Sequence, residues 1–96
     1  MPSESVHLQV PQIAENGAIV PITVESHLPS TRRILIVAEK NPGPLIAEFT
    51  FDEGADAWVS TRIKLNDSGP VLAIAETEGQ FHGTQIEVRV MKGGCG

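Results

Sequence analysis

Clusters of turn-forming residues divide this chain into segments of strand length. The clearest are Glu15-Asn16-Gly17, Asn41-Pro42-Gly43-Pro44 and Asn66-Asp67-Ser68-Gly69-Pro70. Glycine adopts positive φ, proline presets φ, and Asn and Asp tolerate the left-handed region, so such clusters reverse the chain direction. No stretch longer than two helical turns repeats its apolar residues every 3.6 positions. The pattern therefore predicts an all-β fold.

Seven segments between the turns are predicted as strands. Trp58–Leu65 alternates with period two, whereas Arg33–Glu39 is a continuous apolar run, as expected of a strand covered on both faces. Pro21 cannot donate to a sheet and predicts an edge or a bulge. Short strands at this spacing favour a β-sandwich over residues 1–91. The predicted strands are Ser5–Val10, Ala18–Val24, Arg33–Glu39, Leu45–Phe51, Trp58–Leu65, Val71–Glu76 and Gln85–Met91.

Composition excludes several classes of function. The 96 residues suit one domain, and 41% hydrophobic with 20% charged residues is ordinary for a globular protein. The net charge of −5 argues against binding to nucleic acid or to an anionic membrane surface. The longest apolar run, Ile34–Ala38, is too short to span a bilayer. Residues 1–5 lack the features of a signal peptide, so the chain is expected to be cytoplasmic or the mature part of an exported protein.

Metal-binding and catalytic motifs are missing from the sequence. His7, His27 and His82 lie far apart without a metal-ligand spacing, and a single cysteine excludes a Cys-x-x-Cys site. There is no nucleophile elbow and no phosphate-binding glycine loop. We therefore predict scattered histidines, no metal site and no bound cofactor.

Three apolar residues are predicted to face outward, and they are candidates for a protein interface: Ile19, Ile46 and Trp58. Trp58 shares its strand face with Arg62 and Lys64, and a tryptophan beside arginine is enriched at binding hot spots.

The only cysteine, Cys95, lies in the glycine-rich segment 92–96 at the end of the chain. Its glycines have no side chains to pack, so the segment is predicted to form a flexible arm. An extended chain from Val90 to Cys95 reaches roughly 16–18 Å. Such a tether suits a carrier better than an enzyme, whose nucleophile is held beside a base. The predicted arm consists of Lys92, Gly93, Gly94, Cys95 and Gly96.

Composition alone leaves two interpretations of Cys95 open, an incidental terminal residue and a thiol displayed for chemistry. Lys92 would stabilise a thiolate modestly, and the terminal carboxylate would oppose it. A thiol near the reference pKa of about 8.5 is only a few per cent thiolate at neutral pH. Partner enzymes would then have to activate it.

Stretches along most of the chain resemble the SoxY sulfur-carrier family. They are "AENGAIVPITV" (14–24), "AEKNPGPLIAEFTF" (38–51), "VSTRIKL" (59–65), "VLAIAE" (71–76) and the terminal "GGCG" (93–96). The last is the most specific, because this family carries its substrate on the cysteine of a C-terminal GGCGG arm. The present chain ends one glycine short of that pattern.

The resemblance implies an immunoglobulin-like antiparallel β-sandwich and a heterodimer with a SoxZ-like sandwich subunit. It also implies a periplasmic setting, with an export signal removed, and covalent sulfur intermediates on Cys95. The transient partners it implies are a c-type cytochrome coupling enzyme, a sulfate-releasing hydrolase and, in some organisms, a molybdenum-containing sulfane dehydrogenase. The protein itself would be a carrier and not an enzyme.

Two rival interpretations remain open at this level. A ubiquitin-like sulfur carrier uses a terminal Gly-Gly thiocarboxylate, but here two residues follow Gly93-Gly94 and no helix is predicted. A structural or protein-interaction sandwich would leave Cys95 incidental or dimer-forming.

Overall fold

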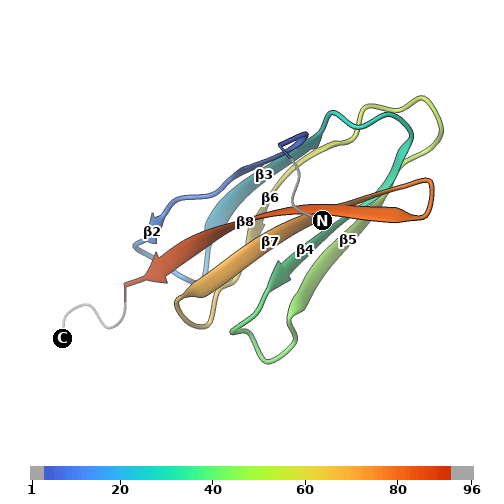
Figure 1. Ribbon diagram of the computed structural model, residues 1–96. Helices are drawn as coiled ribbons and strands as arrows, with labels where there is room; N and C mark the ends of the chain where they lie inside the picture. Colours follow the sequence, from blue (N-terminus) through green and yellow to red (C-terminus); the bar gives the residue numbers. More distant parts are fainter. Residues whose placement is uncertain (1–3, 92–96) are drawn as a thin grey trace.

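Two β-sheets pack face to face in the computed structural model, which describes residues 4–91 (Figure 1). This part of the chain contains eight strands and no helix. In chain order they are β1 (Val6–Gln9), β2 (Ile13–Ala14), β3 (Val20–Ser26), β4 (Thr31–Ala38), β5 (Leu45–Thr50), β6 (Trp58–Ile63), β7 (Gly69–Thr77) and β8 (Gln80–Val90). Among the described residues there is accordingly no helix with the length and hydrophobicity to cross a bilayer. The all-β sandwich predicted from the sequence is confirmed.

The smaller sheet has the order β1-β3-β6 and is antiparallel throughout. Pro21 pairs with Arg62 of β6, but β1 pairs with β3 only from Thr23 to Ser26. The proline therefore lies where β3 has a neighbour on one side only. This confirms the edge that its missing N–H predicts.

The larger sheet has the order β2-β8-β7-β4-β5. Its long strands are antiparallel, whereas the two-residue β2 runs parallel to the end of β8. The first segment of the chain thus contributes β1 to one sheet and β2 to the other. This arrangement is typical of immunoglobulin-like sandwiches. The expected antiparallel sandwich of seven strands gains β2 as an eighth, parallel strand.

Alternation along the strands builds the core between the sheets. Val20, Ile22 and Val24 of β3 face Ile34 and Ile36 of β4 across the sandwich, and all five are almost fully buried. Burial of each such side chain stabilises the fold by about 1.5–3 kcal/mol. The other buried apolar residues are Val6, Ala14, Ala38, Ala57, Ile63, Leu65, Val71, Ala73, Ala75, Val88 and Val90.

A β-bulge in β5 changes the expected orientation of its first residues. Ile36 pairs with Ala47 and Val37 with Leu45, so the extra residue is Ile46. Strict alternation predicts that Leu45 shares the inward face of Ala47, but Leu45 is 54% exposed. Ile46, predicted to face outward, is half-buried and packs against the core. Both predictions were wrong because strict alternation cannot anticipate a bulge.

The predicted strand at Ala18–Val24 is also shifted. β3 begins at Val20, and Ala18, which alternation with Val20 and Ile22 would place inside, is exposed. The N–H of Ala18 instead donates to Oδ1 of Asn16 at 2.9 Å. The turn at Glu15–Gly17 therefore extends two residues further than the sequence pattern indicates.

Candidate functional site

The end of β8 is the point from which the predicted carrier arm departs. Lys92, Gly93, Gly94, Cys95 and Gly96 lie outside the described residues, so the prediction about the arm stays a prediction. Met91, the last described residue, follows the end of β8, which pairs with β2 (Figure 1).

Hydrogen bonds hold this departure point on both sides. The N–H of Met91 donates to the carbonyl of Ala14 at 2.9 Å, and the N–H of Val90 donates to Oγ of Ser68 at 2.8 Å. Ala14 belongs to β2, and Ser68 to the loop before β7. A backbone bond on one edge and a loop hydroxyl on the other thus fix the position of the residues that precede the predicted arm. From Met91 to Cys95 an extended chain then reaches about 13–14 Å.

Gly17 packs against the same end of β8. Its carbonyl accepts from the N–H of Leu65 at 2.7 Å. A Cβ at this position would lie 2.6 Å from the Leu65 carbonyl oxygen and 2.9 Å from Cγ1 of Val90. Only glycine allows this close approach between the first turn and the last strand.

The three predicted interface residues do not form one surface. Trp58 is 55% exposed and lies opposite Glu25, at one end of the β3–β6 pair. Ile19 is 56% exposed but precedes Val20, at the other end of that pair. Ile46 belongs to the other sheet and packs against the core. An interface built from all three together has no geometric support.

A larger apolar surface lies on the outer face of the five-stranded sheet. Leu35 and Val37 of β4 lie opposite Ile74 and Leu72 of β7, and all four side chains are half-buried. Leu45, paired with Val37, and Phe81, on β8, are 54% and 47% exposed. Contiguous exposed apolar surface marks interaction sites. We call these six residues the outer apolar face.

The sequence carried a signal for this face. Arg33–Glu39 was predicted to be covered on both sides because its apolar residues occupy both parities. Among the described residues, only the face of β4 that carries Ile34, Ile36 and Ala38 is fully covered. The outer side carries Arg33, whose Nε donates to Glu76 at 2.5 Å and whose Nη1 donates to Glu48 at 2.6 Å. The hydrogen bond to Glu48 contributes most, and that to Glu76 next, to raising the pKa of Arg33 above its ordinary value.

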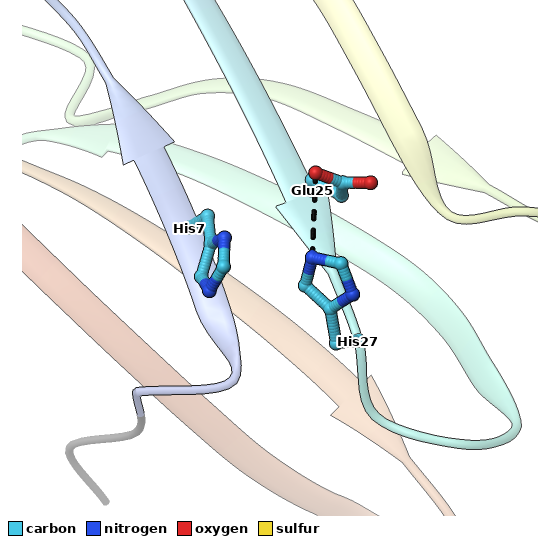
Figure 2. Close-up of side chains that lie close together, drawn as sticks. All are labelled: His7, Glu25 and His27. Carbon is cyan, nitrogen blue, oxygen red and sulfur yellow. Dashed lines mark ion pairs between the residues drawn. The ribbon is translucent and has the colours of Figure 1, made fainter.

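Two of the three histidines, predicted to be scattered, lie together on the outer face of the three-stranded sheet (Figure 2). The rings of His7 and His27 have their centroids 4.5 Å apart and are tilted by 52°. Nε2 of His27 lies 3.3 Å from a carboxylate oxygen of Glu25. His82 lies elsewhere, on β8 opposite Ala75. The expectation of scattered histidines is therefore wrong for His7 and His27, because strand pairing joins residues that are distant in sequence.

A hollow of about 790 Å³ adjoins this cluster. The turn between β3 and β4 forms one wall, and the loop between β5 and β6 forms the other. Glu25, His27 and Trp58 contribute to the lining, together with the acidic side chains of Glu53 and Asp56. Thr31, in the lining of the hollow, pairs with Thr77, and Thr77 pairs with Gln80 at the start of β8. The hollow therefore lies at the end of the sandwich where β8 begins, opposite the end where β8 finishes.

Comparison with solved structures places the fold among known sandwiches. The sulfur carrier protein SoxY from Chlorobium limicola f thiosulfatophilum is 28% identical, with a TM-score of 0.86 over 95% of this chain and 83% of that chain. A superoxide reductase (neelaredoxin) from Ignicoccus hospitalis is 20% identical, with a TM-score of 0.77 over 92% and 81%. The PmoD soluble domain from Methylocystis sp. ATCC 49242 (Rockwell) is 9% identical, with a TM-score of 0.53 over 90% of each chain. The last two likenesses show the fold alone.

Sequence comparison identifies the family. The search of the curated proteins found no match. The family described as sulfur oxidation protein SoxY matches residues 1–95, a range that includes Cys95. The match extends over nearly the whole chain and agrees with the solved SoxY fold, so this protein belongs to the SoxY family of sulfur oxidation proteins.

Proposed function

We propose that Cys95 carries sulfur intermediates covalently and presents them to partner enzymes during the oxidation of thiosulfate. The observation that carries this proposal is the SoxY family match, which extends through Cys95, the only cysteine of the chain. Likeness to a solved sulfur carrier supports a carrier role over a catalytic one.

The geometry of the last strand supports a tether. Val90 and Met91 are held by Ser68 and Ala14, so the start of the arm has a defined position. Three of the five residues that follow are glycine, which passes through narrow openings because it has no side chain. A fixed root with a slim end allows the thiol to enter the clefts of several partners in turn.

The chemistry proposed for Cys95 begins with oxidative coupling. The Cys95 thiolate and thiosulfate form a sulfur–sulfur bond, giving a Cys–S–thiosulfonate, and the two electrons released pass to a c-type cytochrome. Water then attacks the sulfonate sulfur. Sulfate and two protons leave, and a persulfide anion stays on Cys95.

The persulfide has two routes onward. A molybdenum-containing sulfane dehydrogenase takes six electrons, while three waters supply the oxygens of an S-sulfonate and release six protons. Hydrolysis of that S-sulfonate releases a second sulfate and restores the thiolate. In organisms without the dehydrogenase, the sulfane sulfur leaves by another route. In each step the carrier provides the sulfur nucleophile and the reach, and the partner provides the catalysis.

The outer apolar face is the surface that we assign to the SoxZ-like subunit. A second sandwich laid on β4 and β7 would cover Leu35, Val37, Leu72 and Ile74, which their own chain leaves half-covered. The charged group of Arg33, Glu48 and Glu76 borders this surface, as the polar rim of an interface does. In this proposal the complex works in the bacterial periplasm, with a cytoplasmic pathway as the alternative.

Intact-mass spectrometry tests the proposal. Protein purified from cells that are oxidising thiosulfate should carry adducts with the mass of sulfane sulfur or thiosulfonate, and a Cys95→Ser variant from the same cells should carry none. Only Cys95-linked homodimers, or wild-type protein without any sulfur adduct, would favour the structural interpretation instead.

A further inference from the structure

Strand periodicity and register place three potential metal ligands on one surface. Side chains alternate along extended backbone, so Glu25, in β3, and His27, the residue that follows β3, point to the same face. Ser26, between them, and Val24, before Glu25, are buried. The face that carries Glu25 and His27 is therefore the outer one. His7 lies directly opposite Glu25 in the antiparallel β1–β3 pair, and it is exposed as well. Figure 2 shows the three side chains converging above the sheet.

The three donor atoms are already close. One ligand atom each from His7, Glu25 and His27 lies within 4.8 Å of the others. A tetrahedral metal with bonds of about 2.0–2.1 Å needs donors about 3.4 Å apart, so each side chain has to move by about 1 Å or less. The side chains of His27 and Glu25 are 51% and 46% exposed, which leaves room for that adjustment.

The chemistry of the set matches zinc-like cations. Two imidazole nitrogens and one carboxylate oxygen are ligands that Zn²⁺ accepts, and three protein ligands leave a fourth position open. Glu53 and Asp56, in the adjoining hollow, add negative charge near the cluster, and Arg32 in the same lining opposes it. The d electrons of Zn²⁺ impose no preferred coordination geometry. Zn²⁺ can therefore bind N and O donors at the positions that two neighbouring strands provide.

We propose that His7, Glu25 and His27 bind a divalent transition metal of the zinc type, with an open coordination position beside the hollow. The metal would tie β1, an edge strand of four residues, to the central strand β3. The site is independent of the carrier function, since it involves neither Cys95 nor the end of β8. It stands against the sequence prediction of no metal site, which rested on spacing along the chain.

Zinc titration of the full chain tests this proposal. The Cys95→Ser background removes the thiol, which would otherwise compete as a zinc ligand. Isothermal titration calorimetry should show one Zn²⁺ bound per chain. His7→Gln and His27→Gln should each weaken binding by at least about tenfold, the lower end of the loss when a supporting residue of a metal site is removed. Glu25→Gln should weaken it in the same direction.

His82→Gln is the matched control, because it removes a histidine outside the cluster. It should leave the zinc affinity unchanged, and circular dichroism should show every variant folded. Side-chain ¹⁵N NMR of the unsubstituted histidines gives a second readout, in which Zn²⁺ should shift the imidazole signals of His7 and His27 but not of His82. Absence of binding at millimolar Zn²⁺, equal weakening by His82→Gln, or unshifted His7 and His27 signals would each overturn the proposal.

Discussion

His7 of β1 lies directly opposite Glu25 of β3, and this pairing brings its ring to 4.5 Å from that of His27, measured between centroids. The cluster lies at the end of the sandwich where the turn between β3 and β4 lies, whereas β8 finishes at the opposite end, before the predicted arm. Since β8 is 11 residues long, roughly 35 Å separates the start of β8 from its end. A metal site and a sulfur site can therefore be tested separately in one protein.

The glycines before Cys95 should matter for loading and not for stability. Replacing Gly93 and Gly94 together with Val should slow the loading of thiosulfate by the cytochrome partner, because branched side chains obstruct a narrow cleft. The midpoint of urea unfolding should stay unchanged, since the substitutions lie beyond the last strand. Loading rates are measured by intact mass over time, with Cys95→Ser as the blank. Loading at the wild-type rate would show that a slim arm is not required.

Gly17→Ala should destabilise the sandwich. The added methyl group meets the Leu65 carbonyl and Val90, and overpacking of this kind costs on the order of 1–3 kcal/mol. Gly43→Ala is the matched control, because nothing lies within 4 Å of a Cβ there, and its effect should stay within about 0.5 kcal/mol. Urea unfolding gives both values. Equal stability of the two variants would mean that the first turn and β8 relax without cost.

A charge on the outer apolar face should weaken the SoxZ-like complex. Leu72→Asp places a carboxylate on that face, opposite Val37, where a partner would have to desolvate it. The dissociation constant should rise by at least about tenfold, which corresponds to about 1.4 kcal/mol. Ile19→Asp, on an exposed residue next to the other sheet, should leave it unchanged. Calorimetry with the partner subunit measures both, and the reverse order of effects would place the interface on the β1-β3-β6 side.

Arg33→Met should lower the melting temperature modestly, because it removes hydrogen bonds to Glu48 and Glu76. The folded-state pKa of Arg33 is raised, so its contribution is complete below the ordinary arginine value and is lost only as the pH rises through the raised value. The difference in melting temperature from wild type should therefore be the same at pH 7 and pH 9. It should shrink in 1 M NaCl, since the group is partly exposed and salt screens it. A difference that disappears by pH 9 would mean that another group is responsible.

Particular residues show how far the sequence could be interpreted alone. Alternation in 58–65 correctly placed Trp58 outside and Ile63 inside, because a strand has a strict period of two. The same rule failed at Leu45 and Ile46, because a bulge inserts one residue and reverses the orientation before it. Bulges depend on the neighbouring strand, which the local sequence does not describe.

The candidate sites divide in the same way. Cys95 could be singled out from the sequence because it is the only thiol and a glycine-rich segment surrounds it. The outer apolar face had a partial signal in the double-sided apolar pattern of Arg33–Glu39. In the cluster of His7, Glu25 and His27, the two-residue spacing relates only Glu25 to His27, and no local spacing relates His7 to either of them.

The sequence by itself determined the all-β class, the main strands and turns, and the choice of Cys95 as the candidate carrier residue. These follow from local backbone preferences, from the two-residue period and from the identity of a single side chain. Only the tertiary structure decided the parallel β2, the bulge at Ile46, the exposed side of β4 and the meeting of His7 with Glu25. Each of these depends on which strands pair and in which register, and that choice is made by burial of the whole core and not by any one segment.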